Sequence, residues 1–395
     1  MKKKNTDVAT NPTDNESKKT SPLQSKKKIL GIAVGVAAAA IAVAVFLLVL
    51  QQPTSQPQTI TQGIQNPKLG MVIMPPTERP TLEQVQNAYA EAASTGIGRS
   101  NVYMMWPTIE PQQGAFNWQT YDLLMGLNRQ QHLNVTLYFS IINNDEFGPF
   151  PQWLGQPQLD ENLANQTASA LDTILSRYYI VDYVIIGGDM DIYFRDHPGD
   201  IPKYVDFFNS VYSKLKAKHP DVKFGNWFSL NDLINHYDFD MVSKLDQGDF
   251  VAYSFSPVDL TFYQNLGPDS AARELQNMFN YSGGKNIALM EIGWSTDTSV
   301  NGSDDSQVKF IQDAFDFYRK NESKIEFMTW YRQYDRPFET CYDSLNTNVQ
   351  SSFGNKFLLN NTAAYLCGSG LVDMNNNTKP GWNEFKNQVQ MSSNS

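Results

Sequence analysis

Cysteine and histidine are both scarce, with two cysteines and four histidines in 395 residues. The histidines show no metal-ligand spacing, and only the loop "YFRDHPGD" at residues 193–200 places one of them, His197, near two aspartates, Asp196 and Asp200. Loops of this composition are usually polar turns rather than metal sites. We therefore expect neither a metal ion nor a cofactor.

Positive charge is also in short supply, since 31 Lys and Arg face 41 Asp and Glu. Residues 1–28 hold eight Lys against three acidic residues, a net charge of +5, and residues 29–50 have no charge. The chain total of −10 therefore leaves −15 for residues 51–395. Such an acidic domain is a poor partner for nucleic acid or anionic lipid.

Glycine-rich phosphate loops and internal repeats are absent from the sequence. The missing phosphate loop disfavours a nucleotide-binding, doubly wound sheet. The missing repeats disfavour a propeller or a solenoid.

One long run without charge is present, "ILGIAVGVAAAAIAVAVFLLVL" at residues 29–50. Its 22 positions are enough to cross a bilayer as a helix. Lys26, Lys27 and Lys28 precede it, whereas residues 51–67 carry no charge, so we predict a cytoplasmic basic tail at residues 1–28 and a single-pass protein of the cell membrane. A cleaved signal peptide is the alternative, although 28 residues before the run are many for one.

The two cysteines, Cys341 and Cys367, follow this predicted membrane helix and would lie outside the cell. An extracytoplasmic location permits a disulfide between them, worth about 3 kcal/mol through the loop that it closes. Two free, buried thiols are the alternative. Between the membrane helix and the folded domain, the Gln/Pro/Thr-rich residues 51–67 are expected to form a linker.

Eight short apolar runs, rich in β-branched residues, recur from residue 68 onward. They predict strands at residues 69–74, 101–106, 134–142, 181–187, 222–228, 250–255, 286–293 and 325–331. Segments with helical spacing separate them, at residues 81–94, 162–179, 202–218 and 305–320, and a last helix is expected at 381–390. Eight such units predict an α/β fold, a (β/α)8 TIM barrel over residues 68–395.

Function in such a barrel lies at the C-terminal ends of the strands. Polar and aromatic side chains gather at these predicted ends: Trp106, Asn143, Asp189, Asp191, Asn226, Tyr253, Glu291, Trp294, Trp330 and Tyr331. Carboxylates together with aromatic rings suit sugars, because rings stack on the C–H faces and carboxyls act at the glycosidic oxygen.

Four stretches resemble glycoside hydrolase clan A, a group of retaining (β/α)8 glycosidases. "WPTIEPQQGAFNW" (106–118) is similar to the second-strand motif, "VIIGGDMD" (184–191) to the fourth-strand ending, and "LMEIGWST" (289–296) to the seventh-strand nucleophile motif. "CGSGLVDMNNNTKPGWNEF" (367–385) is similar to the closing segment of several such enzymes. The resemblance covers most of residues 68–390.

The resemblance implies that Glu291 is the nucleophile and Asp189 the acid/base of a retaining β-glycosidase. It departs from the family at one place, since the family has Asn-Glu where this chain has Gly188-Asp189. The amide that holds the sugar 2-hydroxyl is therefore missing, and the acid is one methylene shorter. Tyr253 is similar to a strand-six tyrosine that donates a hydrogen bond to the nucleophile.

Each of these residues also has a structural interpretation. Glu291 could form an ion pair, and Asp189 could cap a helix or satisfy a loop. Asp191 is assigned to substrate binding, but a structural role is equally open to it. The substrate-binding assignments of Trp330, Tyr253, Trp106, Asn226, Trp294 and Tyr331 compete with simple packing in the core.

The sequence thus predicts a membrane-anchored, extracytoplasmic glycoside hydrolase acting on β-linked oligo- or polysaccharides. A catalytically weak or inactive barrel that binds carbohydrate in the cell envelope is the alternative, and Gly188-Asp189 is the feature that favours it. A purely structural envelope protein is disfavoured, because aromatic patches left open to water usually mark a ligand site.

Overall fold

The computed structural model describes residues 65–261, 263–348 and 356–393. The predicted cytoplasmic tail, the membrane helix at 29–50 and nearly all of the linker lie outside these ranges. Within the described residues, no helix combines the length and the apolar character that a membrane crossing requires.

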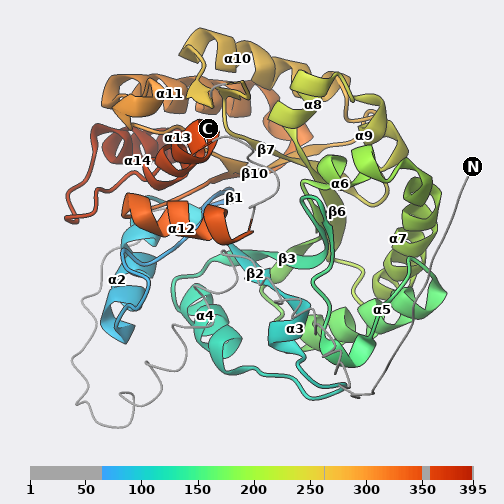
Figure 1. Ribbon diagram of the computed structural model, residues 1–395. Coiled ribbons are helices and arrows are strands. Elements are labelled where there is room, and N and C mark those ends of the chain that lie inside the picture. Colours follow the sequence, from blue (N-terminus) through green and yellow to red (C-terminus); the bar gives the residue numbers. More distant parts are fainter. Residues whose placement is uncertain (1–64, 262, 349–355, 394–395) are drawn as a thin grey trace, which may run out of the picture. The chain divides into compact units, whose positions relative to one another are not determined.

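Eight parallel strands form a closed barrel, with helices around its outside (Figure 1). Each strand pairs with the next one in the chain, and the last pairs with the first, which closes the ring. The barrel strands are β1 (Asn66–Met71), β2 (Ile97–Met104), β3 (Asn134–Asn143), β5 (Val181–Gly188), β6 (Lys223–Ser229), β7 (Phe250–Phe255), β10 (Ile287–Ile292) and β11 (Ile325–Trp330). All eight predicted strands and the predicted (β/α)8 barrel are confirmed.

Three short strands lie outside the ring. β4 (Glu146–Phe147) pairs antiparallel with the end of β3, and β8 (Val258–Asp259) pairs with β9 (Gln264–Asn265). All three follow the C-terminal ends of barrel strands, so they add to the loops of that face.

The helices begin and end largely where the sequence predicts them. Thr81 caps the first described helix in a capping box with Gln84, and Asp160 and Ser303 cap two later ones. The helices are α2 (Leu82–Ala93), α3 (Trp106–Ile109), α4 (Gln119–Gln130), α5 (Glu161–Arg177), α6 (Met190–Asp196), α7 (Ile201–Lys216), α8 (Leu230–His236), α9 (Asp240–Lys244), α10 (Pro268–Asn277), α11 (Asp304–Asn321), α12 (Phe338–Asn348), α13 (Lys356–Cys367) and α14 (Pro380–Ser393).

Two separate layers of side chains hold the barrel together. The larger layer fills the space between the strands and the helices, and a smaller cluster that includes Tyr138, Ile185, Trp227 and Phe327 fills the barrel interior. Both faces of each strand are therefore buried, which explains why the strands read as continuous apolar runs without alternation.

A buried arginine closes the N-terminal end of the barrel. Arg99, near the start of β2, donates two hydrogen bonds to Asp182, at 2.8 and 3.3 Å. Its guanidinium also lies over the rings of Tyr183, at 4.6 Å, and Phe327, at 4.9 Å. This charge has a carboxylate and two ring faces as partners, so it stabilises the barrel at the end that carries no chemistry.

The connection between β11 and α14 contains an additional helical pair, α12 and α13. A disulfide joins Cys341 of α12 to Cys367 of α13, with 5.9 Å between the two Cα atoms. The predicted disulfide is confirmed. Because this connection leaves the C-terminal end of β11, the disulfide holds a helical pair beside the catalytic face.

Candidate active site

Glu291 faces the barrel interior because β10 contains a bulge. Leu289 of β10 pairs with Tyr253 of β7, and the next pair is Glu291 with Ser254. Between these two pairs β10 therefore has one residue that β7 lacks. A bulge of this kind re-aims the following side chain. Here it turns Glu291 toward the mouth of the barrel.

Tyr103, at the end of β2, donates a hydrogen bond to Glu291 Oε1. Asn101 supports this arrangement, since its amide donates to the backbone oxygen of Met290 at 2.8 Å. Tyr331 lies next to them, because its backbone N–H donates to Ile292 O at 2.8 Å. Tyr103 therefore holds the carboxylate of Glu291, and Tyr331, the residue after β11, lies against the backbone beside it.

Asp189 follows the last residue of β5 and stands at the N-terminus of α6 in a left-handed conformation, with φ 45°. Its side chain makes no capping hydrogen bond. Instead it accepts a 2.7 Å hydrogen bond from the hydroxyl of Ser254 on β7. The helix-capping interpretation is therefore wrong for this residue, and its carboxylate reaches across the mouth.

Ser254 brings the two candidate catalytic carboxyls together. Its hydroxyl donates to Asp189, and its backbone is the register partner of Glu291 on the neighbouring strand. The backbone of Glu291 and the carboxylate of Asp189 therefore both lie next to Ser254.

Two aromatic rings occupy the space that a side chain at position 188 would need. A Cβ atom at this position would lie 2.8 Å from Trp227 Cε3 and 2.9 Å from Tyr138 Cε2. These rings contact each other edge to face, with 5.6 Å between centroids. The place where the clan A pattern has an amide is thus filled by an aromatic pair from β6 and β3.

Burial raises the pKa of both carboxyls. The pKa of Asp189 rises to about 6, although the Ser254 hydrogen bond acts to lower it. The pKa of Glu291 rises to about 8, because burial and the charge of Asp189 outweigh the effects of Tyr103 and Arg332. Near neutral pH these values leave one proton on the pair, held by Glu291, while Asp189 is charged; this is the reverse of the distribution that a Glu291 nucleophile and an Asp189 acid need in the first step.

Asp191 is completely buried and ties α6 to the end of β6. Its Oδ1 accepts a 2.7 Å hydrogen bond from the backbone N–H of Ser229, whereas Oδ2 has no hydrogen-bond partner and lies 3.9 Å from Arg195. Burial raises the pKa of Asp191 to about 8, and the charge of Asp189 adds to this effect. The structure places this residue behind the mouth, in a position that fits the structural interpretation.

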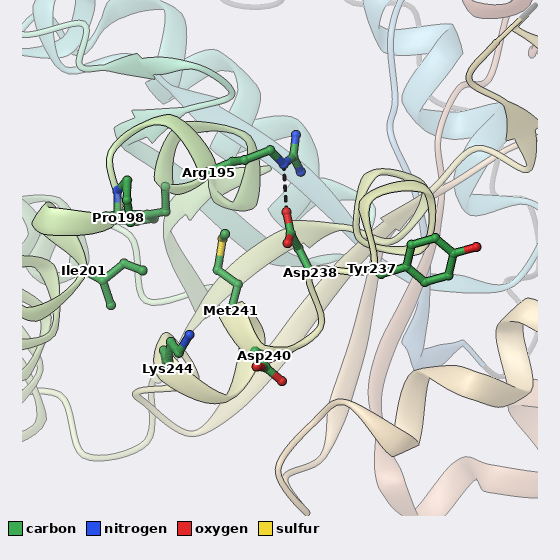
Figure 2. A pocket seen from close by; sticks show the side chains of 9 residues that line it. Arg195, Pro198, Ile201, Tyr237, Asp238, Asp240, Met241 and Lys244 are labelled. Carbon is green, nitrogen blue, oxygen red and sulfur yellow. Dashed lines mark hydrogen bonds and ion pairs between the residues drawn. The ribbon is translucent and has the colours of Figure 1, made fainter.

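Arg195 extends this anchoring of α6. It forms ion pairs with Asp232 and with Asp238, the latter at 2.8 Å. Arg195 and Asp238 line a hollow of about 270 Å³ together with Met241 and Lys244. Figure 2 shows the ion pair between Arg195 and Asp238. The ring of Tyr237 points away from the other labelled side chains. This hollow lies beside α6 and does not include either candidate catalytic carboxyl.

Three tryptophans predicted to bind substrate lie in the packed core. Trp330 lies among Phe310 and Phe385 of the outer helices, and Trp294 also contacts Phe310. Trp106 donates from Nε1 to Glu110 at 2.7 Å. All three are almost fully buried, and a ring without an exposed face cannot stack on a sugar. The packing interpretation accounts for them.

Tyr253 and Asn226 also point outward, toward the helices. Asn226 accepts from Tyr204 at 2.7 Å and donates to Leu245 O at 2.8 Å, and Tyr253 packs near Phe228. Tyr253 makes no hydrogen bond to Glu291, and its hydroxyl is buried without a partner. The predicted tyrosine contact to the candidate nucleophile is therefore made by Tyr103 instead.

Sequence reasoning missed Tyr103, Ser254 and Trp227, which do line the mouth. Ser254 and Trp227 stand one position after Tyr253 and Asn226. Adjacent residues of a strand face opposite sides, so the predictions selected the right strand ends but the outward side chains. Of the predicted residues, Glu291, Asp189 and Tyr331 are brought together at the mouth.

The chain was compared with known proteins. No family profile and no curated protein matches it. Solved structures do, and they include a glycoside hydrolase named GH5_18 from Streptomyces cattleya, in a variant complexed with Manβ1-4GlcNAc. That match has a TM-score of 0.58 and 14% identity, over 83% of this chain and 81% of the other.

Two further similar structures have other activities in their names. Xylanase 10B from Thermotoga maritima matches with a TM-score of 0.55 and 14% identity, over 82% of this chain and 95% of the other. The exo-β-1,4-mannosidase Op5Man5 from an Opitutaceae bacterium matches with a TM-score of 0.60 and 12% identity, over 86% and 63%. At such low identity the likeness shows the fold alone, a (β/α)8 barrel shared with these solved glycoside hydrolases.

Proposed function

We propose that this protein is a retaining β-glycosidase anchored in the cell membrane, with its barrel outside the cell. The observation that carries the proposal is the convergence of Glu291 and Asp189 on Ser254 at the C-terminal mouth. Two carboxyls at this end of a (β/α)8 barrel are the equipment that glycoside hydrolysis needs.

In the first step, the proton that the free site holds on Glu291 must pass to Asp189, so that the carboxylate of Glu291 can attack the anomeric carbon while Asp189 gives this proton to the departing glycosidic oxygen. The hydrogen bond from Tyr103 orients Glu291 and stabilises its charged form. In the second step, Asp189 removes a proton from water, which then releases the sugar from Glu291. The single proton shared by the pair is the one that this cycle moves.

β-linked glycans are the proposed substrates. The similar structures named for β-mannosidic and xylan activity support a β-linked chain as ligand. A membrane anchor at residues 29–50 would keep the barrel close to glycans of the cell surface.

A catalytically weak, carbohydrate-binding barrel is the second candidate. The aromatic pair of Trp227 and Tyr138 beside Gly188 favours it, because this pair leaves no room for the amide of the family pattern. Asp189 must also span the mouth with a side chain one methylene shorter than Glu.

Two measurements on the full-length protein decide between these candidates. Reducing ends released from a panel of β-glycans report cleavage, and an activated 2-fluoro glycoside should label Glu291 covalently. Glu291→Gln serves as the control that should not be labelled. Glycan binding by the wild type with neither cleavage nor labelling would leave only the binding function.

A further inference from the structure

Three arginines are buried in the described part of the chain, namely Arg99, Arg332 and Arg336. Burying a charge is costly unless a partner of opposite charge compensates it. Arg99 has its partner in Asp182, at 2.8 Å. Among the described residues, neither Arg332 nor Arg336 has a carboxylate within ion-pair distance, although they are only 8% and 6% exposed.

Arg332 is fixed next to the candidate nucleophile. It donates to Tyr331 Oη at 2.9 Å and to Leu366 O at 3.0 Å, and its Nε is buried without a hydrogen-bond partner. Tyr331 in turn is bound through its backbone to Ile292, the residue after Glu291. The positive charge of Arg332 opposes the burial that raises the pKa of Glu291.

The guanidinium of Arg336 makes no hydrogen bond or ion pair with the described residues. None of its nitrogens is sealed from solvent, so the group opens toward water although the residue is almost buried. Burial and the charge of Arg332 lower the pKa of Arg336 to about 10, while Glu78 acts in the opposite direction. The backbone N–H of Arg336 donates to Cys367 O at 3.0 Å, next to the Leu366 oxygen that accepts from Arg332, so the two arginines lie against the same end of α13.

The acidic groups near the two arginines either form an ion pair with another residue or make no direct contact with the arginines. Asp335, between the two arginines in sequence, forms an ion pair with Lys379 at 2.6 Å. Glu78 is exposed in the loop after β1 and forms no ion pair. Residues 349–355, which lie outside the described ranges, contain no acidic residue in their sequence.

We propose that Arg336, with Arg332 beside it, forms an anion-binding subsite of the active site that takes a negatively charged sugar of the glycan. The inference rests on the proposed function and adds the substrate class to it. A guanidinium matches the planar fork of a carboxylate, as found in uronic acids, and it also accepts a sulfate. The subsite would let an otherwise acidic domain select an acidic glycan.

Matched pairs of β-linked oligosaccharides test this subsite. In each pair, one member is neutral and the other carries a carboxylate or a sulfate at C6 of a single hexose. Calorimetry on the full-length protein in detergent micelles measures binding directly, without any need for cleavage. The wild type should bind a charged member more tightly than its neutral partner, and added salt should reduce only that difference.

Three variants identify the residue responsible. Arg336→Gln should weaken binding of the charged sugar about 10- to 100-fold, the range of a charge-assisted hydrogen bond, and should change neutral binding less than about 2-fold. Arg336→Lys keeps the charge without the fork and should give a smaller loss. Arg273→Gln makes the same change at an exposed position of α10 and should leave both affinities unchanged.

The outcomes separate this proposal from the proposed function. Equal wild-type affinity for charged and neutral sugars, or an Arg336→Gln variant that keeps the preference, overturns the subsite. Cleavage of neutral glycans can still occur in that case and would support the hydrolase alone. Charge-selective binding without any cleavage would support the subsite and count against the hydrolase. Should Arg336→Gln not fold, Arg336→Lys decides: a reduced preference for the charged sugar supports the subsite, and an unchanged preference overturns it.

Discussion

The hydroxyl of Ser254 donates a 2.7 Å hydrogen bond to the carboxylate of Asp189, across the mouth of the barrel from β7 to the end of β5. The same serine is the register partner of Glu291. A hydrogen bond to a carboxylate favours its charged form, so Ser254 works against the burial that raises the pKa of Asp189. The position of this single hydroxyl therefore sets how the pair of carboxyls shares its proton.

The rate of glycoside cleavage should depend on pH in a bell-shaped manner. The pair titrates at about pH 6 and about pH 8. Below about pH 6 both carboxyls hold protons and no nucleophile is available, and above about pH 8 both are ionised and no acid is available. We expect the maximum of kcat/KM near pH 7, measured between pH 4 and pH 10.

Ser254→Ala should shift one limb of that profile. Loss of the donated hydrogen bond raises the pKa of Asp189, which lies at about 6, so the acidic limb should move to higher pH. A shift of the alkaline limb alone would show instead that Asp189 is the group that holds the proton near neutral pH. Ser210→Ala, on α7, where the serine hydroxyl also donates to a carboxylate, that of the exposed Glu161, provides a control with the same chemical change.

Asp189→Asn should discriminate between substrates by their leaving groups. General acid assistance is worth about 10² to 10⁴ in rate, and only a poor leaving group needs it. Natural glycosides should therefore lose most of their turnover in this variant, whereas aryl glycosides with acidic phenols should form the glycosyl-enzyme almost normally. Burst kinetics measure this step. An equal loss for both substrate types would argue against Asp189 as the acid.

Gly188→Asn should destabilise the fold although it restores one residue of the clan A pattern. Its Cβ would lie under 3.0 Å from both Trp227 and Tyr138, and overpacking of this kind costs about 1–3 kcal/mol. Denaturant unfolding measures the loss. The double variant with Trp227→Leu should be destabilised by less than the sum of the two single changes, because the smaller side chain opens the space beside position 188. An additive effect of the two changes would contradict this direct contact.

Glu291→Gln should raise the melting temperature at alkaline pH. The folded-state pKa of Glu291 is raised from 4.5 to about 8, so the folded protein keeps a proton that the unfolded chain has lost. The free energy of unfolding therefore falls as pH rises through this window, and the neutral glutamine escapes that loss. The gain should be absent at pH 4 and full at pH 9. A gain in melting temperature that does not depend on pH would indicate a packing effect. Glu83→Gln makes the same change on α2 and serves as the control.

The membrane anchor predicts a simple fractionation result. The uncharged run at residues 29–50 and the lysines before it should keep the protein in the membrane fraction after a carbonate wash. Protease added to intact cells should remove the barrel, because the proposed topology places the domain outside the cell. A soluble protein that starts near residue 50 would show that the run is a cleaved signal.

The sequence predicts the strands well but the direction of their side chains poorly. The run at residues 250–255 marks β7 over its whole length, because burial on both faces leaves an apolar signature. The same double burial removes the alternation that would show whether Tyr253 or Ser254 faces inward. Nor does the sequence mark the bulge that turns Glu291 inward, since this depends on pairing with a strand far away in the chain.

Gly188 illustrates a different limit. The sequence shows that the amide is missing, but the reason lies in Trp227 and Tyr138, which come from two other strands. The disulfide was within reach of sequence reasoning, because two cysteines permit only one pairing within the chain. Side chains on distant strands could contact many different partners, so the sequence alone does not single out the contact that forms.

The disulfide between α12 and α13 has a consequence for where this protein works. Arg332 lies against it, with Nη1 3.7 Å from Cys341 Sγ, and holds on to Leu366 next to Cys367. An oxidising environment forms this disulfide, and the disulfide in turn keeps Arg332 in its position at the mouth of the barrel. In a reducing compartment the disulfide would be absent. Glu291 and Asp189 would then keep their positions, whereas Arg332 would be held less firmly. Maturation outside the cytoplasm would then sharpen substrate choice as well as stability.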